Sequence, residues 1–332
     1  MKACVLESIG NLVYREVEEP QVRDGEVLLE IGACGICSSD IDRVFKTGTY
    51  HFPLIPGHEI AGRVVQTGEN AAVFPLIPCR KCEPCKNGDY ALCENYDYFG
   101  SRRNGGFAEY LAVPSWNLVP IDKSVSFECA CLCEPAAVAL HSVRRSEVKI
   151  SDSALVVGTG TIGFLVAEWL HLQGVKQITI LGRSDRKLEF ARSLGFAETC
   201  RYTNMDSLQK NRASVVFECV GSPESVEIAV RSAGKHGRVV LVGNPNGDIK
   251  LLRDSYWQIL RKELSIQGVW NSNFSEKQND WKTVVAALEQ KKLNIAPLIT
   301  HRFSLSECGR AFETLRDRSV FSVKAVFTNG IW

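Results

Sequence analysis

The feature that most constrains the fold is a glycine-rich turn between an apolar run and an amphipathic segment. The run ALVV leads into Gly158-x-Gly160-x-x-Gly163, and FLVAEWLHLQG follows directly. In this context the first glycine permits a tight turn, the second lets the backbone approach a pyrophosphate, and the third lets helix and strand pack closely. A purely structural turn is disfavoured, because strand, turn, helix and a second strand (QITILG) follow in the expected order. The segment therefore predicts a dinucleotide-binding unit.

The alternation of apolar runs and amphipathic segments continues from Ser151 to about Lys292. It predicts an α/β fold, with a doubly wound parallel sheet of Rossmann type over residues 150–292. Residues 1–149 are instead rich in short valine and isoleucine runs broken by glycine and proline, which predicts a mostly-β domain. Residues 293–332 are too few to form a domain alone, so we expect them to pack back on the N-terminal half. A length of 332 residues also favours two hydrophobic cores.

Four cysteines lie close together in the mostly-β half, at Cys79, Cys82, Cys85 and Cys93. Prolines and a glycine surround them, which predicts a loop. Four soft thiolates suit tetrahedral zinc, and a site filled by four protein ligands leaves no position for a substrate. The tight spacing disfavours the alternative of free cysteines. The segment therefore predicts a structural zinc site.

A second set of ligand-type residues is dispersed along the same half: Cys37, His58, Glu59 and Glu134. A mixture of thiolate, imidazole and carboxylate suits a catalytic zinc that keeps one position for water or an alcohol oxygen. A single histidine is more often a structural residue than a ligand, so residue type alone leaves this set open.

The overall composition indicates the class of partner. Lysine plus arginine (39) nearly balances aspartate plus glutamate (38), which gives no electrostatic reason to expect a nucleic acid or an anionic membrane as partner. The first residues carry charges at Lys2 and Glu7 without an apolar run of signal-peptide length, and no later stretch is long enough to span a bilayer. We therefore expect a cytoplasmic protein with a small-molecule partner, its 13 cysteines reduced or bound to metal.

Several segments in chain order resemble the zinc-containing medium-chain dehydrogenase/reductase family, over nearly the whole chain. They are GICSSD, PGHEIAG, the four-cysteine segment, GGFAEY, CEPAAVALH, VVGTGTIG, ECVG and LVGN. Glutamate at position 134, where alcohol dehydrogenases usually carry cysteine, resembles the polyol branch that includes sorbitol dehydrogenase. Within that branch, FGSRRNGGFAEY, LRKEL and PLITHRFSL are most similar to the galactitol-1-phosphate 5-dehydrogenases.

The resemblance implies a GroES-like catalytic domain, a Rossmann domain, and a homodimer or homotetramer. It implies that Cys37, His58 and Glu134 hold a catalytic zinc, that Glu59 is either a direct ligand or a partner that exchanges with water, and that the four-cysteine segment holds a second zinc. The expected dinucleotide contacts are Gly158, Gly160, Thr161, Ile162, Gly163, Gly182, Arg183, Ser184, Lys187, Cys219, Val220, Val242 and Gly243.

The implied reaction is hydride transfer between a secondary alcohol of a polyol or polyol phosphate and NAD(P), with zinc as the Lewis acid. Ser39 matches the proton-relay position of the family, and Asp40 is placed to orient a metal-bound histidine. Turn capping is the alternative role for both residues.

Arg102 and Arg103 are candidates for a substrate phosphate, because the guanidinium fork suits phosphate geometry. Solvated or interdomain arginines are the equal alternative.

Three alternatives to this function remain open at the level of sequence. The substrate could be a non-phosphorylated alcohol, sorbitol or threonine. A zinc-free reductase of the same fold, acting on quinones or enones, would not need Cys37, His58 and Glu134 together, so their joint presence argues against it. A non-catalytic redox sensor would bind the dinucleotide without turning over any alcohol.

The choice of dinucleotide is predicted from the end of the second strand, QITILGRSDRK. NAD enzymes commonly place a carboxylate about twenty residues after the last glycine of the loop, and here that position is Gly182. Arg183, Ser184 and Lys187 are near enough in sequence to contact a 2′-phosphate. This favours NADP over NAD. The alternative is that Asp185 holds the ribose, or that Arg183 stacks on adenine.

Two local features depart from the family pattern. Only residues 69–71 separate GRVVQTG from AVFPL, where the family normally has a longer connection, so part of a strand and turn is missing. The alternating Cys129, Cys131 and Cys133 are unusual, and the alternation predicts buried strand residues. Cys133 could replace a metal ligand if the backbone shifted.

Overall fold

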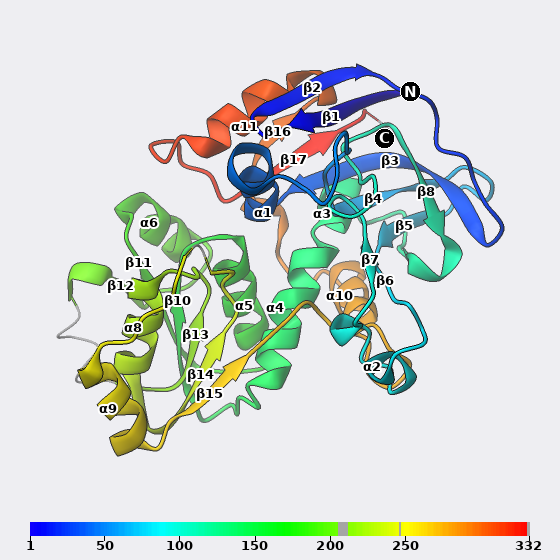
Figure 1. Ribbon diagram of the computed structural model, residues 1–332. Helices are drawn as coiled ribbons and strands as arrows, with labels where there is room; N and C mark the ends of the chain where they lie inside the picture. The colour runs from blue at the N-terminus through cyan, green and yellow to red at the C-terminus, as the bar shows by residue number, and fades with distance from the viewer. Residues whose placement is uncertain (205–211, 246, 331–332) are drawn as a thin grey trace. The chain divides into compact units, whose positions relative to one another are not determined.

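Figure 1 shows the computed structural model of the protein, which describes residues 1–204, 212–245 and 247–330. The chain forms two compact units. Unit 1 comprises Met1–Ala137 and Asn273–Trp332, and unit 2 comprises Val138–Ser272. Within the described ranges, no helix has the length and apolar character needed to cross a membrane.

Unit 2 is built on a six-stranded sheet in the order β12-β11-β10-β13-β14-β15. Every neighbouring pair is parallel, which confirms the predicted Rossmann-type sheet. Helices pack on the sheet, α5 on β10 and β11, α6 on β11 and β12, and α8 on β10, β13 and β14. The strands are β10 (Ser153–Val157), β11 (Gln177–Gly182), β12 (Thr199–Arg201), β13 (Ala213–Glu218), β14 (Ala233–Leu241) and β15 (Ser265–Gly268); the helices are α5 (Thr161–Leu172), α6 (Asp185–Ser193), α8 (Pro223–Ser232) and α9 (Arg253–Lys262).

The central strands of this sheet read as continuous apolar runs because both of their faces are covered. Val156 on β10, Val216 on β13 and Val240 on β14 are all fully buried. Chain order runs outward from β10 in two directions, to β11 on one side and to β13 on the other. The reversal leaves a switch point between β10 and β13 at the carboxyl ends of the strands, where sheets of this kind bind ligands.

Unit 1 contains a mainly antiparallel sheet in the order β16-β17-β3-β4-β5-β9, with β8 also paired to β3. The last strand, β17, lies antiparallel to β3, with Ala325 opposite Ile36. This pairing brings the C-terminal segment against the N-terminal half. The strands are β1 (Lys2–Ser8), β2 (Asn11–Glu16), β3 (Glu26–Ile36), β4 (Glu59–Val64), β5 (Asn70–Val73), β6 (Leu76–Ile77), β7 (Asp97–Tyr98), β8 (Tyr110–Pro114), β9 (Leu118–Pro120), β16 (Ile299–Phe303) and β17 (Lys324–Thr328); the helices are α1 (Ser38–Asp42), α2 (Glu83–Lys86), α3 (Phe127–Cys131), α10 (Asp280–Glu289) and α11 (Cys308–Arg316).

The unit boundaries differ from those expected from the sequence. Helix α4 (Cys133–Arg145) runs from unit 1 into unit 2, and α10 belongs to unit 1 although residues 150–292 read as one Rossmann segment. The reason lies in packing: Trp281 of α10 is 1% exposed and meets Phe74 of unit 1 edge-on, with 5.6 Å between ring centroids. An amphipathic helix has the same periodicity whichever core it covers, so periodicity alone does not place it.

The cysteine alternation at residues 129–133 is not a strand, so that expectation was wrong. Cys129 and Cys131 lie in α3, and Cys133 begins α4. Ser126 starts α3 as its N-cap, since its hydroxyl accepts a hydrogen bond from the Cys129 N–H at 3.3 Å. Three alternating positions are too few to separate a strand from a turn of buried helix.

The shortened connection after β4 closes as a tight hairpin. The Val64 N–H donates to the Glu69 carbonyl and the Gly68 N–H to the Val64 carbonyl, both at 2.8 Å. Strand β5 then pairs with β4, with Arg63 opposite Asn70. The missing residues therefore shorten the hairpin without removing the strand pairing beside the candidate site.

Candidate functional site

The first part of the site is formed where β3 ends. Cys37 follows the last residue of β3 and is the N-cap of α1. Its backbone N–H donates to Asp40 Oδ2 at 3.0 Å, so the fully buried aspartate closes the first turn of the helix. The strand end and the capped turn together fix the direction of the Cys37 side chain.

Three of the four dispersed ligand-type residues come together in unit 1. Cys37, His58 and Glu59 place one ligand atom each within 4.8 Å of one another. Gly57 precedes His58 with φ of +94°, in the left-handed region that glycine adopts readily, and this turn delivers His58 and Glu59 to the start of β4. Residues far apart in the sequence are thus joined by the pairing of β3 with β4.

His58 is oriented by a buried polar network. Its Nδ1 lies 3.3 Å from Asp40 Oδ1, which leaves Nε2 for a metal. Arg43 donates to the same Asp40 oxygen at 3.1 Å and to Ser39 Oγ at 2.9 Å. Burial lowers the pKa of His58, but the Asp40 carboxylate outweighs this and raises it well above its usual value. Burial conversely raises the pKa of Asp40, and His58 with Arg43 brings it below its usual value.

Glu59 is held by a lysine from the far end of the chain. Lys324 Nζ donates to both carboxylate oxygens of Glu59, at 2.6 and 2.7 Å. Both side chains are buried, at 3% and 1% exposure. Burial lowers the pKa of Lys324, and the Glu59 carboxylate more than reverses this and raises it.

Glu134 lies apart from the group of three. It is the second residue of α4 and is buried, and its Oε1 accepts a hydrogen bond from the Tyr98 hydroxyl at 3.5 Å. The Tyr98 ring in turn lies 5.9 Å from the His58 ring, between centroids. Burial raises the pKa of Glu134 to about 7. The structure therefore places Glu134 beside the site, while Glu59 stands in the ligand group itself.

The donor set fits zinc. One thiolate, one imidazole nitrogen and a nearby carboxylate form a mixed set of the kind that holds catalytic zinc with a position left for another ligand. An ion held there would act as a Lewis acid toward an alcohol or carbonyl oxygen.

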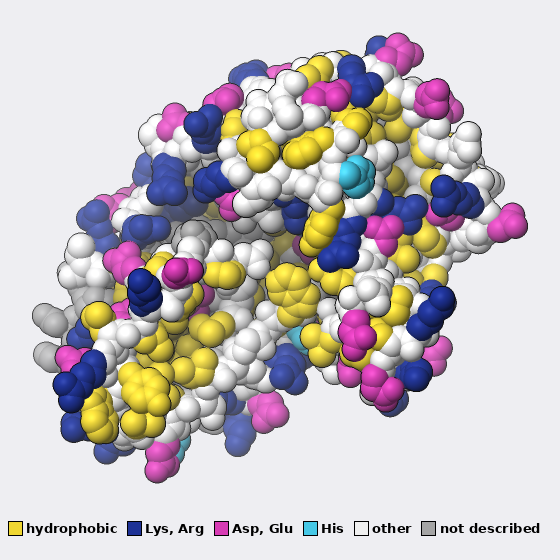
Figure 2. All heavy atoms as spheres, viewed as in Figure 1, with side chains coloured by type: hydrophobic (Ala, Val, Ile, Leu, Met, Phe, Trp, Pro, Cys, Tyr) yellow, Lys and Arg dark blue, Asp and Glu magenta, His cyan; other side chains and the backbone are white. Residues whose placement is uncertain are grey.

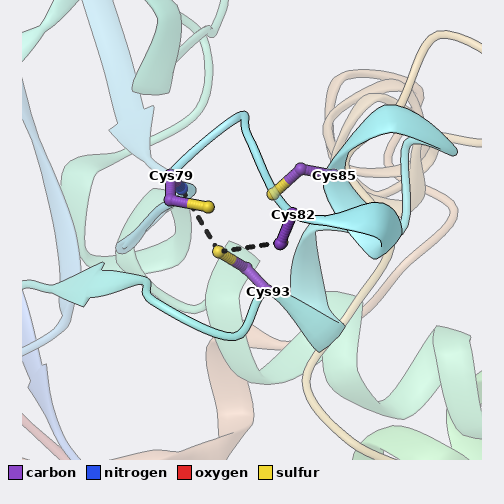
Figure 3. A group of neighbouring side chains, drawn as sticks. All are labelled: Cys79, Cys82, Cys85 and Cys93. Carbon is purple, nitrogen blue, oxygen red and sulfur yellow. Dashed lines mark hydrogen bonds between the residues drawn. The ribbon is translucent and has the colours of Figure 1, made fainter.

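The four-cysteine segment also assembles as expected for zinc (Figure 3). The sulfur atoms of Cys79, Cys82, Cys85 and Cys93 lie within 4.8 Å of one another and point into a common space. Backbone N–H groups donate to two of these sulfurs. The N–H of Lys81 helps to lower the pKa of Cys79 to about 6. The Cys79 N–H donates to Cys93 Sγ at 3.2 Å, although burial keeps the pKa of Cys93 above its usual value. All 13 cysteines, each within the described ranges, are free thiols. Four thiolates and no other ligand suit a structural ion.

The three glycines of the first loop in unit 2 have the geometry required to cradle a pyrophosphate. Gly158 has φ of +122°, which permits the turn after β10. A Cβ added to Gly160 would meet nothing within 4 Å, so the backbone there is open to a ligand. A Cβ at Gly163 would lie 2.1 Å from the Gly158 carbonyl oxygen, so only glycine allows α5 to approach the strand this closely. Thr161 and Ile162 form the first turn of α5.

The other expected dinucleotide contacts follow the carboxyl ends of neighbouring strands. Cys219 and Val220 come after β13, and Val242 and Gly243 after β14. Glu218 ties these two strand ends together, because its carbonyl accepts hydrogen bonds from Val242 and Gly243 at 2.9 and 3.0 Å. These residues therefore lie on the sheet edge that carries the glycine loop.

The residues after β11 include an exposed arginine, and the nearest carboxylate in the sequence is already paired with another arginine. Gly182 ends the strand, and Arg183 and Ser184 after it are exposed. Asp185, the alternative ribose acceptor, forms an ion pair with Arg201 at 3.1 Å. Burial lowers the pKa of the neighbouring Lys187.

The two arginines of the SRRNGG segment differ in their surroundings. Arg103 lies 3.7 Å from Glu26 and 3.6 Å from Asp97, so its charge is partly neutralised. Arg102 lies between two aromatic rings, 4.4 Å from the ring centroid of Tyr50 and 4.4 Å from that of Tyr96. Among the described residues, no carboxylate forms an ion pair with Arg102, whose Nη2 donates instead to the Tyr50 hydroxyl at 3.2 Å.

Sequence reasoning missed three residues of this site: Arg43, Tyr98 and Lys324. A signal for Lys324 was available, because it is the one charged residue in the apolar run SVKAVF. Tyr98 and Arg43 gave no such signal, since both lie in polar segments.

Family comparisons place both parts of the chain. Residues 23–123 match the alcohol dehydrogenase GroES-like domain, and residues 161–290 match the zinc-binding dehydrogenase domain. Galactitol 1-phosphate 5-dehydrogenase of Escherichia coli strain K12 is 33% identical over 330 residues, covering 94% of this chain and 95% of that protein. L-idonate 5-dehydrogenase of Vitis vinifera is 29% identical, covering 89% of this chain and 86% of that protein.

Solved structures of similar proteins have the same fold over nearly the whole chain. Galactitol-1-phosphate dehydrogenase from Escherichia coli has a TM-score of 0.92 at 32% identity and covers 99% of this chain and 100% of that one. A putative zinc-binding dehydrogenase from Sinorhizobium meliloti 1021 bound to NADP has a TM-score of 0.91 at 27% identity, and a short chain alcohol dehydrogenase from Escherichia coli CFT073 complexed with NADH has 0.90 at 26%; each covers 99% of both chains. The chain therefore belongs to the zinc-containing medium-chain dehydrogenase/reductase family, and it is a zinc-dependent alcohol or polyol dehydrogenase.

Proposed function

We propose that this dehydrogenase transfers a hydride between a secondary alcohol of a polyol phosphate, of galactitol 1-phosphate type, and NADP. The observation that carries the reaction is the grouping of Cys37, His58 and Glu59 within 4.8 Å, with Glu134 beside them. A zinc ion held by Cys37, His58 and Glu134 would supply a Lewis acid that lowers the pKa of the substrate hydroxyl. The nicotinamide of a dinucleotide bound at the glycine loop would supply the hydride acceptor.

The chain's own residues orient the ligands and move the proton. Asp40 fixes the ring of His58 from behind, with Arg43 holding the aspartate in turn. Ser39 Oγ accepts from Arg43 at 2.9 Å, so the hydroxyl keeps its own proton and a second lone pair. It can therefore take a proton from the substrate hydroxyl while passing its own toward solvent.

Arg102 is the proposed contact for the substrate phosphate. The rings of Tyr50 and Tyr96 hold its guanidinium in place. Its Nη2 donates to the Tyr50 hydroxyl at 3.2 Å, and the other N–H groups of the fork remain available for a phosphate. The Tyr96 ring lies 6.1 Å from that of Tyr98, which contacts Glu134 and His58. One aromatic contact thus links the arginine to the residues around the metal site. Arg103, with two carboxylates nearby, is the weaker candidate.

We expect galactitol 1-phosphate to be oxidised with a far higher kcat/KM than galactitol, sorbitol or threonine. Arg102→Gln should lower kcat/KM for the phosphate by about 10- to 100-fold, because a hydrogen bond to a charged group contributes about 1.5–3 kcal/mol. Oxidation of the free polyol should change little. Steady-state kinetics on the panel measure both effects, and Arg103→Gln is the matched control in the same loop.

The panel also separates the alternatives. Turnover of a free polyol as fast as its phosphate would contradict phosphate recognition and favour the non-phosphorylated substrate class. Dinucleotide binding without turnover of any alcohol would favour the redox sensor instead.

NADP is the proposed dinucleotide, because Arg183 and Ser184 are exposed at the end of β11 while Asp185 is paired with Arg201. A carboxylate cannot simply be added at Gly182, since a Cβ there would lie 2.6 Å from Thr159 Cγ2. The clean test is therefore Arg183→Gln, which should lower the kcat/KM ratio of NADP to NAD by about tenfold or more through loss of a charged hydrogen bond. Arg192→Gln, on helix α6 that follows this strand end, is the control. A parent enzyme with a higher kcat/KM for NAD would overturn the proposal.

We also propose a homodimer formed through the β15 edge of unit 2, with a homotetramer as the alternative assembly. Strand β15 is an edge strand, and exposed apolar side chains gather over it and α9 at the lower left of Figure 2. Exposed apolar patches of this kind commonly mark association sites. On these two elements the exposed apolar residues are Tyr256, Trp257, Leu260 and Ile266, and Ile249, Leu252 and Trp270 lie in the flanking segments; all are exposed by 40–63%. Sedimentation velocity of the intact protein measures the assembly.

A further inference from the structure

The buried pair of Lys324 and Glu59 joins the C-terminal strand to the metal ligands. Besides both oxygens of Glu59, Lys324 Nζ donates to the Ile36 carbonyl at 3.1 Å. An ammonium has three donors, so these contacts use all of them. Ile36 directly precedes Cys37, and Glu59 directly follows His58. One lysine therefore holds the backbone before one ligand and the side chain after the other.

The position of the Glu59 carboxylate is set on its other side by Gly35. A Cβ on Gly35 would lie 1.9 Å from Glu59 Oε2, so the carboxylate occupies the space that any other residue would fill. The acid is thus confined between the bare backbone of β3 and the ammonium of β17. It still lies within 4.8 Å of the ligand atoms of Cys37 and His58, close enough for a small movement to bring it onto a metal there.

A buried carboxylate requires a positive partner, because an isolated charge in the protein interior is strongly destabilised. Two partners are within reach of Glu59: the ammonium of Lys324 and a metal ion at Cys37 and His58. If the carboxylate bound the ion, it would occupy a coordination position. A catalytic zinc with three protein ligands needs that position for the substrate oxygen.

We propose that Lys324 is a positioning residue that holds Glu59 off the metal and so keeps a coordination position open for the substrate. The inference rests on the proposed function, since it requires a metal at Cys37 and His58. It assigns Lys324 no contact with substrate. It predicts that loss of the ammonium leaves Glu59 with only the metal as partner and closes the site.

The test uses the intact protein with cobalt(II) exchanged into the mixed-ligand site and zinc kept at the four cysteines. Imidazole is the probe, because it binds an open position on the cobalt and shifts its visible absorption. Lys324→Met should weaken imidazole binding by about tenfold or more, an affinity difference of about 1.4 kcal/mol, and should change the spectrum of the free protein. Lys324→Arg, which retains the charge, should resemble the parent.

Two further variants test the proposal as well, and Glu59→Gln does so even if Lys324→Met does not fold. Glu59→Gln should retain the parental cobalt spectrum, because Glu59 is not a ligand while Lys324 holds it. Lys324→Met with Glu59→Gln should regain parental imidazole affinity, because no carboxylate remains to close the site. A changed spectrum in Glu59→Gln, or unchanged imidazole binding in folded Lys324→Met, would overturn the proposal. A parent that binds no cobalt outside the four cysteines would instead overturn the proposed function.

Discussion

His58→Ala and Glu134→Ala are each expected to lower kcat/KM by about a thousandfold or more, since a Lewis-acid metal contributes several kcal/mol to the transition state and each 1.4 kcal/mol is a factor of ten. His58 supplies the nitrogen of the ligand group, and Glu134 is the buried carboxylate beside it. Steady-state kinetics measure the loss, and elemental analysis measures the metal. Zinc content should fall from two ions per chain toward one in His58→Ala.

The fold should survive both substitutions. Both side chains are buried, but neither belongs to the apolar core of unit 1, which includes Ile31, Phe107 and Phe327. His171→Ala, an exposed histidine on α5, is the control and should retain full activity. Unchanged turnover in Glu134→Ala would remove that residue from the site and leave Glu59 as the carboxylate ligand.

The glycine loop illustrates what the sequence could determine about the fold. The roles assigned to Gly158, Gly160 and Gly163 follow from local backbone geometry, and the structure has a positive φ, an open Cβ direction and a close helix approach at these three positions, in that order. Such features depend on few neighbours, so sequence spacing predicts them well. The assignment of α10 depended on packing against Phe74 and its neighbours, which periodicity does not encode.

The residues of the candidate site likewise fall into those that the sequence could predict and those that it could not. Cys37 and His58 could be predicted because their residue types and motifs carry the chemistry. The sequence could not predict which of Glu59 and Glu134 lies nearer to Cys37 and His58. The position of the Glu59 carboxylate depends on Lys324, which approaches it from a strand 265 residues further along the chain. The unequal surroundings of Arg102 and Arg103 depend likewise on Glu26 and Asp97, which lie elsewhere in the sequence.

Cys82→Ser is expected to destabilise the protein strongly while leaving the mixed-ligand site in place. The segment from Cys79 to Cys93 contains only α2 and a short 3-10 turn, and its sulfurs crowd together, with Cys82 Sγ 3.9 Å from Cys93 Sγ. So short a loop buries little apolar surface to offset the cost of ordering it, and structural zinc supplies folding free energy directly.

The effect should extend beyond the loop itself. Arg80 of the loop lies 4.6 Å from the ring centroid of Trp116, and Tyr90 meets the same ring edge-on at 5.2 Å. Trp116 in turn contacts Phe74 and Phe274 in the aromatic cluster that also receives α10. Loosening of the loop therefore removes packing from the junction of β5, β9 and α10.

We expect the melting temperature of Cys82→Ser to fall by about 8–16 °C, taking a loss of about 4 kcal/mol and about 2–4 °C per kcal/mol for a unit of this size. Differential scanning calorimetry with elemental analysis measures the shift and the zinc content. Cys129→Ser is the control, since Cys129 belongs to neither ligand group and is only half-buried. If Cys82→Ser kept two zinc ions per chain and the parental melting temperature, the four cysteines would not form a structural site. A loss of one ion with no thermal effect would mean that the aromatic contacts of Arg80 and Tyr90 hold the loop without the metal.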